Sequence, residues 1–182
     1  MKNFQFKIKE AELTDISLIA PLFDQYRIFY GQKSFLSGAG AFLMERFQNQ
    51  ESYLFFAHDF NDPKIVFGFT QLYPTFSSVS MKPLLILNDL FVDEPFRKEG
   101  IAFALLTRAK EFARNQNAKG LTLSTALENS NAQKLYQKFG FQKEEEFISF
   151  HYFFTQEPED PAEETEIINH QFSKDTFNQL FK

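Results

Sequence analysis

Two segments of the sequence combine residue types suited to holding an anion and moving a proton. The first, residues 92–102, is typical of a strand end, a tight turn and the start of a helix near Gly100. No Ser, Thr, Asp or Asn stands between Pro95 and Ala102 to cap that helix. The backbone N–H groups of its first turn are therefore available to an anion, which the helix dipole also favours.

The residue types in this turn fit the same purpose. Gly100 permits close approach of the backbone to a phosphate, because a Cβ there would collide with it. Arg97 and Lys98 add positive charge. The alternative is a strand–helix turn that needs a glycine and carries exposed basic residues without any ligand.

The second segment, residues 129–141, predicts a short helix that Gly140 ends. Tyr136 lies in it and could protonate a leaving group, since a phenol with a pKa of about 10 can supply a proton to a thiolate whose thiol has a pKa of about 8.5. The plainer alternatives are that Ser130 and Gln133 form a capping box that only starts the helix, and that Tyr136 belongs to the core.

A carboxylate precedes the turn, within the apolar run from Leu84 to Val92. Asp89 could accept a proton from a nucleophile, or it could be a structural anchor, and ordered water could replace it as the base. Its neighbour Asn88 carries no charge, so it adds no second carboxylate.

The elements that must position these residues follow from hydrophobic spacing and turn residues. Hairpin-forming strands come first and strand–helix alternation follows, which predicts an α/β (α+β) fold with helices on both faces of a mixed, mostly antiparallel sheet of six to seven strands. The expected strands are 4–9, 53–57, 64–73, 84–92, 120–126 and 147–155. The expected helices are 14–29, 39–48, one that begins near residue 100, and 130–139.

The chain is predicted to contain one domain, residues 1–155, followed by an extension, residues 156–182. The extension begins as an acidic, proline-containing linker and ends in a short apolar stretch, which could dock on the domain or on a neighbour. No apolar run approaches the length of a membrane helix, and the first residues lack the apolar core of a signal peptide, so we expect a cytoplasmic protein.

Composition excludes several kinds of chemistry. The 182 residues include no Cys, which excludes disulfides and a Cys nucleophile, and His58, His151 and His170 lack the spacing of metal ligands. We therefore expect no metal. The net charge of −5 argues against a nucleic-acid partner. The 26 Phe residues are most simply explained as core residues.

The two segments together resemble the GNAT family of N-acetyltransferases, which transfer an acetyl group from acetyl-CoA to an amine. The family's Gln/Arg-x-x-Gly-x-Gly/Ala turn is matched by Arg97, Gly100 and Ala102. Its later Asn-x-x-Ala-x-x-x-Tyr signature, with a following Gly-Phe pair, is matched from Asn129 to Phe141. The resemblance covers roughly residues 4–155 and implies the GNAT fold.

The resemblance also implies roles for individual residues. Tyr136 would be the general acid and Asp89 a candidate base, although polyamine acetyltransferases of the family carry Glu-Asp where this sequence has Asn88-Asp89. The strand before the turn, the turn itself and the Asn129 segment would hold acetyl-CoA. The implied cofactor-binding residues are Leu90, Phe91, Val92, Arg97, Lys98, Glu99, Gly100, Ile101, Ala102, Asn129 and Ala132.

The acceptor site would use Tyr26, Phe29 and Tyr30. Their spacing resembles the Hpa2-like, polyamine-acetyltransferase-like branch of the family, which acetylates small basic amines and lysine-like acceptors and self-associates. We therefore expect an N-acetyltransferase that uses direct transfer to a primary amine and forms a homodimer. The alternative is a GNAT-fold module that binds acyl-CoA or a protein partner without turnover.

Overall fold

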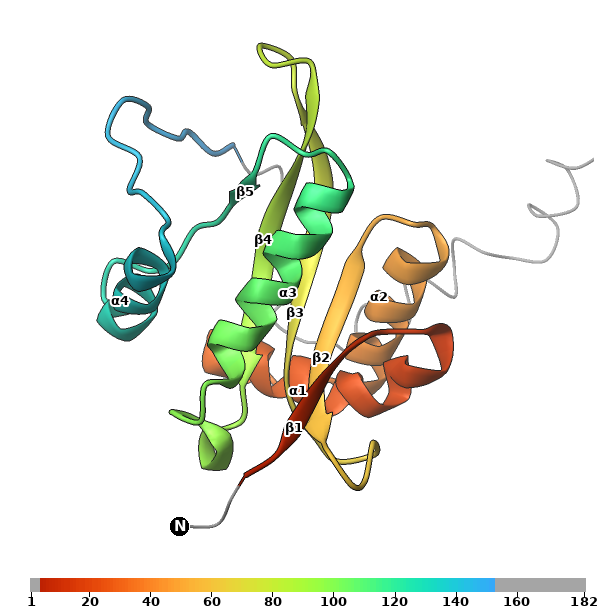
Figure 1. Ribbon diagram of the computed structural model, residues 1–182. Coiled ribbons are helices and arrows are strands. Elements are labelled where there is room, and N and C mark those ends of the chain that lie inside the picture. Colours follow the sequence, from red (N-terminus) through yellow and green to blue (C-terminus); the bar gives the residue numbers. More distant parts are fainter. Residues whose placement is uncertain (1–3, 153–182) are drawn as a thin grey trace, which may run out of the picture. The chain divides into compact units, whose positions relative to one another are not determined.

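The computed structural model describes residues 4–152, in which five strands form one sheet in the order β1-β2-β3-β4-β5 (Figure 1). The strands are β1 (Phe6–Glu10), β2 (Tyr53–Asp59), β3 (Val66–Ser77), β4 (Lys82–Val92) and β5 (Leu121–Thr122). The helices are α1 (Ile16–Phe29), α2 (Leu36–Gln48), α3 (Ile101–Asn115) and α4 (Ser130–Phe139), with short 3-10 turns at Leu13–Asp15 and Glu94–Phe96.

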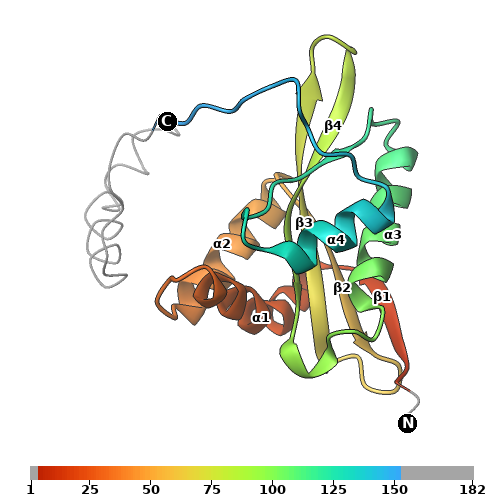
Figure 2. The same cartoon turned by 90° about the vertical axis from the view of Figure 1, so that its left-hand side faces the viewer.

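The first four strands are antiparallel and β5 joins β4 in parallel. Helices α1 and α2 cover one face of the sheet and α3 covers the other, as Figure 2 shows with the sheet seen from its side. Each face has its own apolar core: Leu54 and Phe56 of β2 point toward α1 and α2, whereas Phe55 and Ala57 point toward α3. This alternation is the two-residue period of a strand buried on both faces.

A bulge in β4 changes which side chains face which helices. Gln71 of β3 pairs with Asp89 and Leu72 pairs with Leu87, so Asn88 is an extra residue in β4. Leu87 belongs to the α3-side core, whereas Phe91, four residues on, belongs to the α1-side core. The bulge therefore turns Asp89 toward the face that α1 covers.

The predicted fold class is confirmed, and most elements lie where the spacing placed them. The helix predicted at 130–139 has those bounds, and Gly140 ends it with a φ of +108°. Helix α2 begins earlier than predicted, at Leu36, because the glycines at 38 and 40 do not break it. Strands β3 and β4 are longer than predicted because they continue as a two-stranded hairpin beyond the end of β2.

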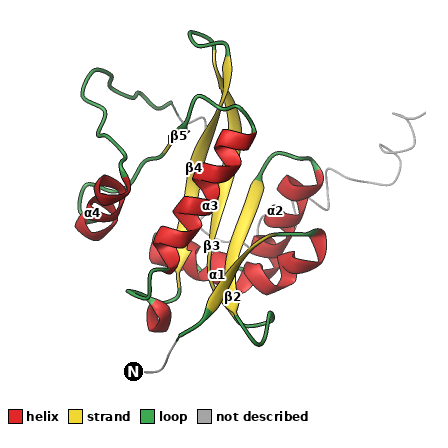
Figure 3. Cartoon of the chain, in the orientation of Figure 1, coloured by secondary structure: helices red, strands yellow, loops and turns green. Residues whose placement is uncertain are grey.

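The described part of the chain has five strands, fewer than the six to seven predicted. The strand predicted at 120–126 shrinks to Leu121–Thr122, because its ladder with β4 is confined to Leu85 and Ile86. Residues 147–152 of the last predicted strand are loop (Figure 3), and the rest of that strand lies outside the described residues. A strand needs a paired neighbour, and alternating apolar residues alone do not supply one.

The chain divides into two compact units, with the boundary between Lys143 and Glu144. The domain boundary predicted at 155/156 and the extension at 156–182 lie outside the described residues. Within residues 4–152, no helix combines the length and apolar character needed to cross a bilayer.

Candidate active site

The turn before α3 leaves the start of that helix open. Gly100 is the N-cap residue with a φ of +84°, and no side chain caps the helix. A Cβ built on Gly100 would have no protein atom within 4 Å, so the protein leaves room beside the backbone here. Lys98 also has a positive φ, +69°, which is uncommon outside glycine. This geometry fits the predicted anion site, because unpaired N–H groups and free space coincide at one helix end.

Arg97 is already engaged within the protein. Its Nε donates a hydrogen bond to the Val92 carbonyl oxygen at 3.0 Å, and its guanidinium lies 5.7 Å from the centre of the Phe91 ring. These contacts tie the turn to the end of β4. Arg97 therefore has a structural role as well as contributing positive charge.

Strand β4 separates from β5 on the approach to this turn. The parallel ladder contains only Leu85 with Leu121 and Ile86 with Thr122. Beyond Ile86, no described strand pairs with the edge of β4 that faces β5. Leu90 and Val92, expected to contact the pantetheine arm, lie on this separated stretch and are half-buried. The opening gives an extended ligand access to the backbone of β4.

Asn129 starts helix α4 with its own side chain. Its Oδ1 accepts a hydrogen bond from the Ala132 N–H at 3.2 Å. The predicted capping box of Ser130 and Gln133 was wrong, because the cap is one residue earlier and the Gln133 amide donates instead to the carbonyl oxygens of Ala126 and Leu127. The expected role of Asn129 toward the pantetheine arm stays a prediction.

Tyr136 is half-buried on α4, with its ring centre 5.8 Å from that of Phe141. Burial, and secondarily Tyr30, raises the pKa of the Tyr136 hydroxyl to about 12. The group is therefore protonated at neutral pH and able to donate. A proton transfer from this hydroxyl to a thiolate whose thiol has a pKa of about 8.5 would be uphill. Hydrogen-bond donation to the departing sulfur is thus the stronger contribution that Tyr136 can make.

Asp89 is a buried carboxylate with one oxygen unused. Its side chain is 2% exposed; Oδ1 accepts a hydrogen bond from Asn88 Nδ2 at 3.1 Å, whereas Oδ2 has no hydrogen-bond partner among the described residues. Burial raises the pKa of Asp89 to about 6, although the nearby Tyr26 hydroxyl and Asn88 amide favour the charged form. A carboxylate of this kind is ionised at neutral pH and still basic enough to take a proton.

Tyr26 lies beside the Asp89 carboxylate, and Tyr30 and Tyr136 lie near Tyr26. Tyr26 packs on the sheet through Phe69 and Phe91, and its ring centre lies 5.0 Å from that of Tyr30. Burial, and then the charge of Asp89, raises the pKa of Tyr26 well above its ordinary value. Tyr26 also lies near Tyr136. It therefore connects the candidate base with the candidate acid.

The other predicted acceptor residue is more remote. Phe29 is 58% exposed, and its one described ring contact is with Tyr30, at 5.2 Å between centres. Tyr30 itself is 49% exposed. Of the three predicted acceptor residues, Tyr26 is therefore packed against Asp89 and the sheet, Tyr30 is partly exposed beside it, and Phe29 is the most exposed.

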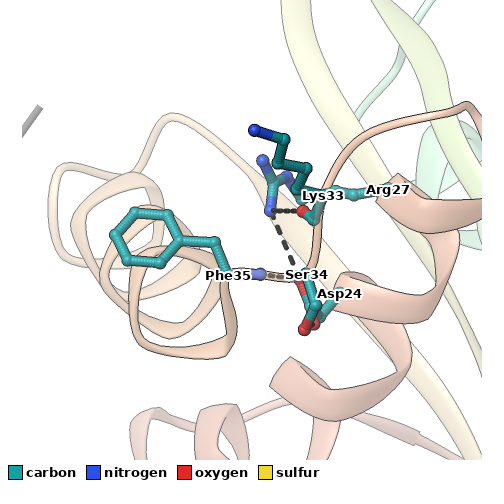
Figure 4. A network of polar contacts seen from close by, with 5 residues as sticks. All are labelled: Asp24, Arg27, Lys33, Ser34 and Phe35. Carbon is teal, nitrogen blue, oxygen red and sulfur yellow. Dashed lines mark hydrogen bonds and ion pairs between the residues drawn. The ribbon is translucent and has the colours of Figure 1, made fainter. Parts of the chain in front are cut away.

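A buried carboxylate fixes the loop that follows Tyr30. Asp24 on α1 accepts hydrogen bonds from Ser34 Oγ at 2.6 Å, from the Phe35 backbone N–H at 2.8 Å and from Arg27 Nη1 at 3.3 Å (Figure 4). Burial opposes its charge, but these three donors outweigh that effect and lower the pKa of Asp24. The loop between α1 and α2, which follows the predicted acceptor residue Tyr30, is therefore held by one ionised group.

Sequence reasoning missed two polar residues of β3 that share this face of the sheet. Gln71 is fully buried directly opposite Asp89, and Tyr73 is close enough to feel the charge of Asp89. Gln71 is the one long amide side chain in the mostly apolar stretch 66–73, which was the available signal. Its importance depends on its cross-strand partner, and that partner is fixed by the bulge in β4.

Two further features lie apart from these residues. A hollow of about 270 Å³ between α3, α4 and the start of β5 contains none of the predicted site residues. Within residues 4–152, no group of three or more His, Cys, Asp and Glu side chains is arranged to hold a metal ion.

Comparison with known proteins identifies the family. The sequence profile of the Acetyltransferase (GNAT) family matches residues 21–141. The chain is similar to the uncharacterized N-acetyltransferase YhfO of Bacillus subtilis (strain 168), with 48% identity over 143 residues that cover 79% of this chain and 94% of that protein. It is also similar to the crystal structure of a probable acetyltransferase, with 38% identity, a TM-score of 0.79, and coverage of 83% of this chain and 99% of the other.

A more distant structural relative supports the fold alone. This is a predicted acetyltransferase with acetyl-CoA from Clostridium acetobutylicum, with 16% identity, a TM-score of 0.66, and coverage of 81% of this chain and 96% of the other. The profile match spans more than half of the chain and includes both segments singled out above. The chain therefore belongs to the GNAT family, as an acetyl-CoA-dependent N-acetyltransferase.

Proposed function

We propose that this acetyltransferase transfers the acetyl group directly to the primary amine of a small basic molecule or a lysine-like acceptor. The observation that carries the proposal is the group formed by Asp89 with Tyr26, next to Tyr30 and Tyr136. A buried carboxylate among aromatic rings suits a cationic acceptor, because both the negative charge and the ring faces attract ammonium groups.

Acetyl-CoA supplies an activated acetyl thioester and an anionic pyrophosphate. We place the pyrophosphate at the open start of α3, from Arg97 to Ala102, where the helix lacks a side-chain cap. Support for the pantetheine position comes from the separation of β4 from β5 after Ile86. The backbone of Leu90 and Val92 and the side chain of Asn129 are the proposed contacts.

The chain's own residues would then divide the proton transfers. Asp89 takes the proton that the amine must lose, and the amine's electron pair forms the new C–N bond to the acetyl carbon as the C–S bond breaks. The Tyr136 hydroxyl donates a hydrogen bond to the departing sulfur and stabilises its negative charge. No covalent acyl-enzyme is needed, since the sequence has no Cys to carry one.

The decisive experiment measures release of the CoA thiol from acetyl-CoA with a panel of polyamines, amino acids, aminoglycosides and lysine peptides, and identifies the acetylated product by mass spectrometry. Sustained turnover with basic amines and not with neutral amines of the same size supports the proposal. Binding of acetyl-CoA without turnover on any amine would favour a non-catalytic acyl-CoA-binding or protein-interaction role.

We further propose that the protein is cytoplasmic and forms a homodimer. Apolar side chains exposed on the described chain support self-association: Phe147 is 76%, Ile148 80% and Phe150 86% exposed. Light scattering at tens of micromolar should give the mass of a dimer for the full chain. A monomeric mass would overturn the dimer, and a dimer that persists in a chain ending at Gln156 would exclude the last 26 residues as its interface.

A further inference from the structure

Gln71 is a buried amide whose hydrogen-bonding capacity is unused. It lies in the middle of β3 and is 0% exposed, and both Nε2 and Oε1 lack a hydrogen-bond partner among the described residues. Leaving such a group unpaired in the interior costs on the order of 1–3 kcal/mol. A leucine would fill a similar volume without that cost, so the amide at this position calls for a functional explanation.

The nearest candidate partner is the unused oxygen of Asp89. Gln71 and Asp89 are directly opposed in the β3–β4 ladder, so their side chains lie on the same face of the sheet. Because Oδ1 is already bonded to Asn88 Nδ2, the oxygen left for Gln71 is Oδ2. The two residues thus combine one unused donor, Nε2, with two unused acceptors, Oε1 and Oδ2.

The bulge in β4 creates this arrangement. Without the extra residue Asn88, the side chain at position 89 would share the α3 face with Leu87. The bulge turns it to the face that α1 covers, where Gln71 lies. A strand distortion and a buried amide therefore meet at the carboxylate that the proposed reaction uses.

We infer that Gln71 is a positioning residue for Asp89: its amide holds Oδ2, directly or through one water, and so sets the orientation and the proton affinity of the carboxylate. This inference rests on the proposed role of Asp89 as base. In the resting structure the hydrogen bond is unmade. One water between Nε2 and Oδ2, or a small rotation of the amide, would complete the contact in the free enzyme.

Other groups also face Asp89, and the Tyr26 hydroxyl, like the Asn88 amide, favours its charged form. Tyr26 approaches from α1, Tyr73 on β3 is close enough to feel the charge of Asp89, and the charge of Arg46 on α2 acts on Tyr73. Asp89 forms no ion pair with a described cation. Gln71 is the fully buried amide whose Nε2 donor has no other partner among the described residues, and its loss would remove a group that stabilises the ionised form.

The test follows the carboxyl carbon of Asp89 by ¹³C NMR titration in protein labelled at aspartate, with the signal assigned through Asp89→Asn. In Gln71→Met, which keeps the length of the side chain but removes the amide, the Asp89 pKa should rise by about one unit. The acidic limb of the kcat/KM–pH profile should move to a pH about one unit higher, so that kcat/KM on the acid side of the limb falls about tenfold.

The matched control is Thr70→Val. Thr70 neighbours Gln71 and donates from Oγ1 to the Asp89 backbone oxygen at 2.8 Å, so its loss affects stability without touching the carboxylate. In Thr70→Val we expect the Asp89 pKa and the acidic limb of the kcat/KM–pH profile to equal those of the unmodified protein. An unchanged Asp89 pKa in Gln71→Met, or an equal shift in both variants, would overturn the inference.

A second measurement needs no substitution in β3. In the unmodified enzyme saturated with acetyl-CoA and the best acceptor amine, the Gln71 side-chain amide signals should titrate together with the Asp89 carboxyl carbon. Independent titration contradicts the inference. Loss of the acidic limb in Asp89→Asn tests the proposed function separately, so the two ideas can fail independently.

Discussion

Gln71 and Asp89 oppose each other across β3 and β4, both buried, and the bulge at Asn88 puts their side chains on one face of the sheet. This relationship links the architecture to the proposed chemistry. Burial raises the pKa of the Asp89 carboxyl because water is excluded. The bulge that turns Asp89 into this buried position also brings it opposite the polar side chain of Gln71. Stability and proposed activity should therefore depend on pH through the same group.

The first prediction concerns the stability of the fold. The folded-state pKa of Asp89, about 6, lies above its ordinary value of 3.8, so the folded protein binds more protons than the unfolded chain between these values. The contribution of Asp89 to the unfolding free energy is therefore lost as pH rises through about 6, by about 3 kcal/mol. Urea unfolding of Asp89→Asn should lack this decline and show a more stable protein at pH 7. A variant with the same pH dependence as the unmodified protein contradicts the buried-carboxylate account.

The second prediction concerns Tyr136. Tyr136→Phe keeps the ring and its contact with Phe141 but removes the hydroxyl. We expect kcat to fall on the order of 10–1000-fold, with acetyl-CoA affinity unchanged. The control is Tyr53→Phe on β2, where the ring centre lies 4.5 Å from that of Phe112 on α3, and it should keep the unmodified rate. Parallel losses of activity and stability in Tyr136→Phe would instead mark a core tyrosine.

Local sequence signals predicted α4 and the open start of α3 because both depend on residues close in the chain. Apolar spacing gave the length of α4, and Gly140 marked its end. The absence of capping residues before Ala102 matched the lack of a side-chain cap in the structure. These features need no knowledge of the rest of the fold.

Long-range pairing explains what the sequence did not reveal. The run from Leu84 to Val92 is apolar on both faces, so its pattern cannot show where an extra residue enters or which way Asp89 points. For the same reason the sequence does not show that Gln71 faces Asp89. The short β5 also depends on a distant part of the chain, because its partners Leu85 and Ile86 of β4 lie 36 residues before Leu121 and Thr122.

The third prediction tests the placement of the pyrophosphate. Gly100→Glu adds bulk and negative charge at the open helix start, and acetyl-CoA affinity should fall at least ~100-fold, about 2.7 kcal/mol. Gly31→Glu is the matched control, because Gly31 has nearly the same φ, +85° against +84°, and equally open surroundings. Both variants carry the same backbone strain, so calorimetry isolates the effect on the ligand. Equal affinities in the two folded variants would move the pyrophosphate site elsewhere.

The last prediction concerns the loop on the acceptor side. Asp24→Ala removes the acceptor of the Ser34, Phe35 and Arg27 hydrogen bonds, which should cost about 1–3 kcal/mol of unfolding free energy at pH 7. Because the folded-state pKa of Asp24 is lowered, its contribution is present above about pH 4 and is lost as pH falls through that lowered value. The difference between Asp24→Ala and the unmodified protein should therefore shrink in acid, opposite to the effect at Asp89.

The same substitution separates loop order from catalysis. With the loop after Tyr30 released, KM for the amine should rise several-fold while acetyl-CoA affinity stays constant, because the donor site lies on other elements. Asp59→Ala is the control: Asp59 Oδ1 accepts from the Asn61 and Asp62 N–H groups in the β2–β3 turn, so its loss frees a different turn of the same domain. A rise in KM for both variants would indicate general destabilisation, and an unchanged KM in Asp24→Ala would remove this loop from the acceptor site.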